Sequence, residues 1–216
     1  MNDMSLTLGP IALPTLLRFT ATALLIELTP GPNMGYLAIV AAQRGRSAGL
    51  TVIAGVTLGL TLYLAATVAG VAQGFLDNRY VYETLRWSGV VYMVWLAKDA
   101  WHPEPMTNAH ELPLQRTRLF ARGLLANLLN VKAAILYAVL LPAFLDGKRG
   151  SLPLQALTLG SVHLVIATTV HCSIVMLAAR SRILVTNHTS EWLGRTYAVA
   201  LLAVAGWLAW STRVSA

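Results

Sequence analysis

The chain has 216 residues, of which 56% are hydrophobic and 12% are charged, and its mean hydropathy is +0.61. Soluble domains carry roughly 25% charged residues, so this composition excludes a soluble globular protein and indicates a single integral membrane domain over residues 1–216. The net charge of +7 would suit a nucleic-acid partner, but the basic residues lie in short loops between apolar segments, where they act as topology signals. We therefore expect the lipid bilayer, and no nucleic acid, as a partner.

The first apolar segment, residues 19–43, contains a cluster of helix-breaking residues. Glu27 is its only charged residue, and Pro30-Gly31-Pro32 follows shortly after it. Proline has no backbone N–H and clashes with the preceding turn, so a continuous helix is not expected here. Broken backbone within a membrane is tolerated only where it is buried in protein or lines a wet cavity. We predict that the first helix is broken at Pro30-Gly31-Pro32 and lines a site; the alternative is a kink satisfied by neighbouring helices.

Five further apolar segments follow, near or above the roughly 20 residues that cross a bilayer. They are residues 47–76, 80–101, 123–145, 150–179 and 196–212. The proline-rich segment 102–118 is predicted to be a loop that connects a first half, 19–101, to a second half, 119–212. Each half has three spans, and an odd number requires any internal repeat to be inverted. We predict an all-α membrane protein with six transmembrane helices in two inverted three-helix repeats, an architecture of transporters.

The second half echoes the first, because the polar residues Asn127, Asn130 and Lys132 interrupt its first apolar segment. Glu27 and Lys132 are charges deep in predicted spans, where charge is costly, so we expect them to face a cavity or pair with each other. One hypothesis makes Glu27 a proton-coupling site that gains a proton when substrate displaces Lys132. The alternative is a static buried ion pair.

The segment 150–179 carries His163, His171 and Cys172, which are residue types that bind soft metal ions. The two histidines are eight residues apart, or about 12 Å along a helix, so one ion could not readily bridge both from this helix. We therefore predict no metal site and take His163 as a candidate proton carrier.

Small residues form a stripe on the second segment that permits close contact with a neighbouring helix or a second subunit. The stripe consists of Gly55, Gly59, Ala66, Gly70 and Gly74. A homodimer is one outcome of such a stripe. Several aromatic residues near segment ends, Tyr197 among them, are interpreted as interfacial anchors.

Several motifs resemble the LysE/RhtB family of bacterial amino-acid exporters across most of the chain. They are Thr29-Pro30-Gly31-Pro32-Asn33, Gly45-Arg46-Ser47-Ala48-Gly49-Leu50, Leu85-Arg86-Trp87-Ser88-Gly89-Val90-Val91-Tyr92 and Asn127-Leu128-Leu129-Asn130-Val131-Lys132-Ala133. The resemblance implies a secondary active exporter of amino acids or amino-acid derivatives from the cytoplasm, driven by the proton gradient. It also implies a multi-pass protein of the bacterial inner membrane.

The two broken segments offer both charges that an amino acid needs. Freed N–H groups at the half-helix near Asn33 suit a carboxylate, and carbonyls upstream of Pro30 suit an ammonium group. The alternative role of the asparagines is hydrogen bonding between helices. The predicted substrate-binding residues are Pro30, Gly31, Pro32, Asn33, Asn127, Asn130 and Lys132, and the predicted proton-coupling residues are Glu27 and His163.

Two residues depart from the family pattern. Val131 stands where the family usually has proline, so the second break is expected to be milder or absent, and Glu27 is not part of the pattern. No GxxxxGK[ST] phosphate loop and no nucleophile with a nearby base stand out, so we expect no cofactor and no enzymatic activity. The alternatives are a heavy-metal cation exporter of the same superfamily and a membrane scaffold without transport.

Overall fold

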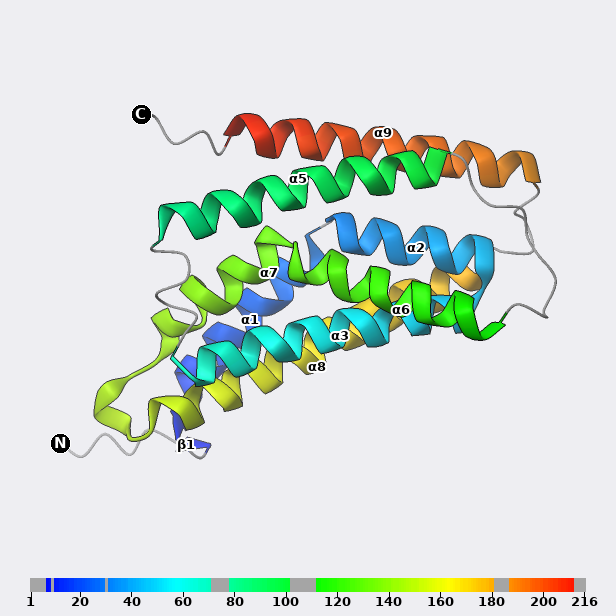
Figure 1. Ribbon diagram of the computed structural model, residues 1–216. Coiled ribbons are helices and arrows are strands. Elements are labelled where there is room, and N and C mark those ends of the chain that lie inside the picture. Colours follow the sequence, from blue (N-terminus) through cyan, green and yellow to red (C-terminus); the bar gives the residue numbers. More distant parts are fainter. Residues whose placement is uncertain are drawn as a thin grey trace.

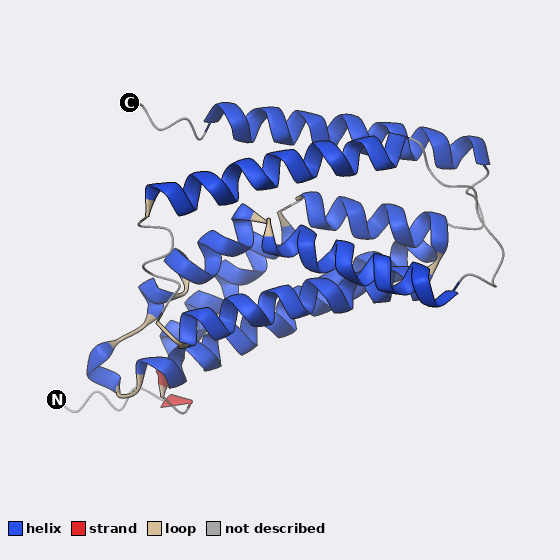
Figure 2. Cartoon of the chain, in the orientation of Figure 1, coloured by secondary structure: helices blue, strands red, loops and turns tan. Residues whose placement is uncertain are grey.

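The computed structural model describes residues 7–8, 10–29, 31–70, 78–101, 112–180 and 187–211, and most of them are helical (Figures 1 and 2). The prediction of an all-α protein is therefore confirmed, apart from a short antiparallel pair, β1 (Thr7–Leu8) and β2 (Ile11–Ala12). The helices are α1 (Leu13–Leu28), α2 (Pro32–Arg44), α3 (Arg46–Val68), α5 (Arg79–Trp101), α6 (Leu112–Leu128), α7 (Val131–Ile135), the π-helical η2 (Leu136–Leu140), the 3₁₀ turns η3 (Pro142–Phe144) and η4 (Gly147–Arg149), α8 (Leu152–Arg180) and α9 (Asn187–Ser211).

The helices pack in two groups. In Figure 1, α5 and α9 run alongside each other, and α3 packs against both α6 and α8. The broken helices lie between, with α1 and α2 both packed on α8. The second group consists of α1, α2, α3, α6, α7 and α8, and its fully buried core includes Leu37, Val52, Val56 and Leu159. This packing brings the region around Pro32 close to α6, α7 and α8.

Glycines set the close approach of α3 to α6. A Cβ atom added at Gly55 would collide with the Phe120 carbonyl, and one at Gly123 would collide with the Val52 carbonyl. The next glycine of the stripe, Gly59, packs against the side chain of Asn127. The first part of the small-residue stripe is therefore used within the chain, as the neighbouring-helix interpretation predicted. Gly70 has no neighbouring atom within 4 Å, and Gly74 lies outside the described residues, so the homodimer stays a prediction.

The first helix break lies where the sequence predicts it. Helix α1 ends at Leu28, where the N–H and the hydroxyl of Thr29 both donate to the carbonyl of Leu25 (3.1 and 2.8 Å). Gly31 is extended, and α2 starts at Pro32, whose missing N–H would have had no helical partner in the first turn. Pro30, a predicted substrate-binding residue, lies outside the described residues.

The second break is present although proline is absent. Of the two expected outcomes, a milder break or none, the second is therefore wrong. Asn130 is the N-cap of α7, and its side-chain oxygen accepts the N–H of Lys132 (3.0 Å). The helical segments on either side of this break are bent by 52°. An asparagine side chain can replace a helical backbone partner, so it ends one helix and starts another without proline.

Every predicted apolar segment contains a helix, but fewer of them qualify as membrane spans. By length and composition α3 and α8 can each cross a bilayer, and the bent α6–α7 pair makes a third span if it counts as one; this search covers only the described part of the chain. Helix α6 begins at Leu112, so residues 112–118 of the predicted connecting loop are helical.

Candidate functional site

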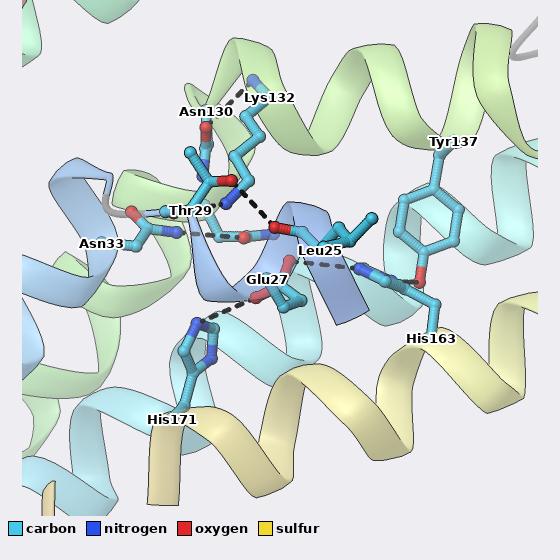
Figure 3. A network of polar contacts seen from close by, with 10 residues as sticks. Leu25, Glu27, Thr29, Asn33, Asn130, Lys132, Tyr137, His163 and His171 are labelled. Atoms are coloured by element: carbon cyan, nitrogen blue, oxygen red, sulfur yellow. Dashed lines mark hydrogen bonds and ion pairs between the residues drawn. The ribbon is translucent and has the colours of Figure 1, made fainter. Parts of the chain in front are cut away.

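Glu27 lies at the centre of a buried polar cluster at the end of α1. Its side chain contacts two histidines of α8: Oε1 lies 3.3 Å from Nε2 of His163, and Oε2 lies 3.5 Å from Nε2 of His171 (Figure 3). All three residues are at least nine-tenths buried. His163 and His171 are too far apart along α8 for one metal ion to bridge them readily. The Glu27 carboxylate contacts both, because its two oxygens point in different directions.

Tyr137 extends the cluster beyond His163. Its hydroxyl lies 3.0 Å from Nδ1 of His163, and both side chains are fully buried. Tyr137 belongs to the π-helical segment η2, and the hydroxyl of Thr67 donates to its carbonyl (3.0 Å). When His163 carries its proton on Nε2, it donates to Glu27 and accepts from Tyr137, so its ring is held from both sides.

His171 is held from one side only. Its Nδ1 is buried and has no hydrogen-bond partner among the described residues. It also lines a small cavity of about 20 Å³, together with Glu27, Asn33, Asn127 and Lys132. A volume of this size holds roughly one water molecule.

Lys132 and Glu27 face the same cavity, the first of the two expected arrangements, and they do not pair with each other. The ammonium of Lys132 instead donates to the carbonyl of Thr29 (3.1 Å), one of the carbonyls that the end of α1 leaves without a helical partner. Within the described residues, the close contacts of the Glu27 carboxylate with basic side chains are those with the two histidines. The static Glu27–Lys132 pair is therefore not what the structure contains. The bond to Thr29 joins the two breaks directly, as Figure 3 shows.

The asparagines also connect the two breaks. Nδ2 of Asn33, in the first turn of α2, donates to Oδ1 of Asn127, in the last turn of α6 (3.3 Å). Both side chains are buried, and Nδ2 of Asn127 has no partner among the described residues. The side-chain oxygen of Asn130 accepts the hydrogen bond that caps α7. Asn33 and Asn127 therefore form the interhelical bond that was their alternative role, with one buried donor left over.

Tyrosine hydroxyls satisfy two more backbone carbonyls at the breaks. Tyr197 donates to the Pro32 carbonyl (3.1 Å), and Tyr63 donates to the Leu128 carbonyl (2.6 Å). The ring of Tyr197 also packs against Gly35, where a Cβ atom would collide with it. The interpretation of Tyr197 as an interfacial anchor is therefore wrong, because its hydroxyl binds the start of α2.

The structure brings the predicted site residues together from both halves of the chain. Gly31, Pro32, Asn33, Asn127, Asn130 and Lys132 share one cavity wall, with Glu27 on the same cavity and His163 behind it. The sequence singled out neither Tyr137 nor His171 as a partner of Glu27. Within the described residues, no group of three or more His, Cys, Asp or Glu residues could hold a metal ion.

A family model described as LysE type translocator matches residues 24–212. The chain is 28% identical over 164 residues to the homoserine/homoserine lactone efflux protein of Salmonella typhimurium, covering 75% of this chain and 79% of the relative. It is 27% identical over 154 residues to the leucine efflux protein of Enterobacter sp., covering 70% of each chain. An uncharacterized membrane protein of Vibrio cholerae is 27% identical, with 76% of this chain and 80% of the relative covered. No solved structure matches the chain.

Proposed function

The chain belongs to the LysE type translocator family, and we propose that it exports amino acids or amino-acid derivatives from the cytoplasm in exchange for protons. It is a membrane transporter, and its family consists of transporters rather than enzymes. The relatives named for homoserine and leucine efflux support an amino-acid substrate. Because these relatives are bacterial, we further propose that the chain resides in the bacterial inner membrane.

We also propose that the fold has six spans in two inverted halves, residues 19–101 and 119–212. Each half begins with a broken helix, α1–α2 in the first and α6–α7 in the second. The breaks meet through the Lys132–Thr29 and Asn33–Asn127 hydrogen bonds. Broken helices that meet at the interface between repeats are where transporters of this kind bind substrate.

In this proposal the substrate replaces the Lys132–Thr29 hydrogen bond. The ammonium of Lys132 and the free N–H groups at the start of α2 receive the substrate carboxylate. The carbonyl of Thr29 receives the substrate ammonium group, because it already binds the ammonium of Lys132. An amino acid carries both complementary charges, so it satisfies both partners of the bond that it breaks.

The observation that carries proton coupling is the burial of Glu27 between two histidines. Ionisable groups are costly within a membrane, and they mark proton pathways in transporters. Exchange requires that proton and substrate exclude each other at the site, since coupling is reciprocal. If Glu27 gained a proton when substrate binds, proton and substrate would cross the membrane in the same direction, which is not exchange. We therefore propose that Glu27 loses a proton when substrate binds: the substrate ammonium near Glu27 releases the proton from the Glu27–histidine cluster.

The test is transport by the full chain in inside-out membrane vesicles with an acidic lumen. We expect labelled amino acids to accumulate in the lumen, and a protonophore should abolish the accumulation. Vesicles from cells that lack the protein are the control. If no amino acid of a full panel moves, the scaffold alternative is favoured. Movement of divalent heavy metals instead would favour the cation-exporter alternative.

A further inference from the structure

A large apolar cavity lies beside the two helix breaks. Its volume is about 710 Å³, within the roughly 300–1,000 Å³ that small-molecule sites occupy. Its walls come from α1, α2, α5, α6, α7, η2 and α9, so it lies between the α5–α9 pair and the broken helices. Figure 1 shows the α5–α9 pair at the top of the view and the broken helices below it.

This cavity shares a wall with the small polar cavity beside Glu27. Residues that line both are Gly31, Pro32, Asn33, Asn130, Lys132 and Leu136. The groups proposed to bind the charged ends of an amino acid, Lys132 and the start of α2, therefore stand on the floor of the apolar cavity. Thr29, whose carbonyl accepts from Lys132, lines it as well.

Away from that floor, the lining is apolar. It includes Met93, Leu96, Leu129, Ile135, Leu140 and Val204. Tyr92 also contributes to the wall, but its hydroxyl already donates to the carbonyl of Arg122 (3.0 Å). A hydroxyl group placed against these side chains would lose its hydrogen bonds to water without gaining others, which is unfavourable. An aliphatic or aromatic side chain would lose nothing.

We propose that this cavity receives the side chain of the transported amino acid, and that the chain selects amino acids with large apolar side chains over small polar ones such as homoserine. This inference rests on the proposed function. The binding groups for the charged ends and the apolar cavity adjoin, so one molecule occupies both. A lipid acyl chain would match the apolar walls, but it has no polar group that could bind the Lys132 ammonium or the Thr29 carbonyl on the floor.

The first test compares leucine and homoserine as labelled substrates for the full chain in inside-out vesicles with an acidic lumen. We expect kcat/KM for leucine to exceed that for homoserine by about tenfold or more, the discrimination that apolar pockets give. Equal or faster homoserine transport would overturn the inference and leave the proposed function intact. If neither these two nor any other amino acid moves, both fail.

The second test fills the cavity. Ile135→Trp and Val204→Trp place a larger side chain at its wall. We expect each variant to lower kcat/KM for leucine about tenfold or more while homoserine transport changes much less. Val139→Trp and Val199→Trp make the same kind of change at exposed positions that do not line the cavity, and they should leave the ratio of the two substrates unchanged. An unchanged ratio in the cavity variants would overturn the inference and favour a lipid occupant.

Discussion

Replacing Glu27 by glutamine tests the proposed coupling most directly. The amide has the shape of the carboxylate, so it still fits between His163 and His171, but it can neither carry the negative charge nor exchange the proton. We expect the variant protein to fold and to move amino acids down their gradient. We expect it to lose accumulation against a gradient.

The size of the effect follows from the number of carboxylates in the cluster. Glu27 is the carboxylate between the two histidines, so we expect one proton to be exchanged for each amino acid. Each pH unit across the membrane is worth about 1.36 kcal/mol for one proton, a factor of ten in concentration. With the membrane potential clamped at zero, a gradient of two units should sustain accumulation of about 100-fold. For Glu27→Gln the ratio should fall to about one.

The assay measures steady-state accumulation in inside-out vesicles at several imposed pH gradients. A plot of the logarithm of the accumulation ratio against the pH difference should have a slope of about one for the unaltered chain and about zero for Glu27→Gln. Glu191→Gln is the matched control, because Glu191 is an exposed carboxylate on α9 paired with Arg195. An unchanged slope in Glu27→Gln would refute the coupling role, whatever the rate of transport.

Two further changes test the substrate site and the helix packing. Lys132→Gln should raise KM for amino acids about tenfold or more, because charge-assisted hydrogen bonds are worth about 1.5–3 kcal/mol. Lys148 lies in an exposed turn, and Lys148→Gln should leave KM unchanged. Equal KM values in the two variants would contradict the binding role of Lys132. Gly123→Leu should destabilise the detergent-solubilised protein by about 1–3 kcal/mol or more, since the side chain would meet the backbone of α3. Gly206→Leu, which faces open space, should leave the melting temperature unchanged, and equal melting temperatures would argue against the tight crossing.

The sequence predicts the helix breaks well because their causes are local. Pro32 prevents the preceding helix from continuing, and it starts the next one whatever surrounds it. The break before Val131 also has a local cause, although no proline is present. Asn130 followed by a helical segment is an N-cap signal, and this signal predicts a break in the absence of proline.

The sequence could not predict which side chains meet, because this depends on tertiary packing. The eight residues between His163 and His171 fix their separation on α8, but not the fact that the end of α1 inserts a carboxylate between them. Tyr137 reaches His163 from a π-helical turn, and such turns have no reliable local signature. The position of Tyr197 near a segment end predicts an interfacial anchor. The Tyr197 hydroxyl binds the Pro32 carbonyl because α9 lies beside α2 in the fold.

The two histidines beside Glu27 are not equivalent, and their difference bears on the path of the proton. His163 is held on both nitrogens, by Glu27 and by Tyr137, so its ring is fixed in the cluster. His171 contacts Glu27 through one nitrogen, has no partner for the other among the described residues, and lines the cavity that contains Lys132. Glu27 and His171 both line that cavity, whereas His163 does not, so His171 is the histidine that connects the carboxylate to it. Within the proposed exchange, we infer that His163 orients the carboxylate and that His171, rather than His163 as the sequence suggested, transfers its proton.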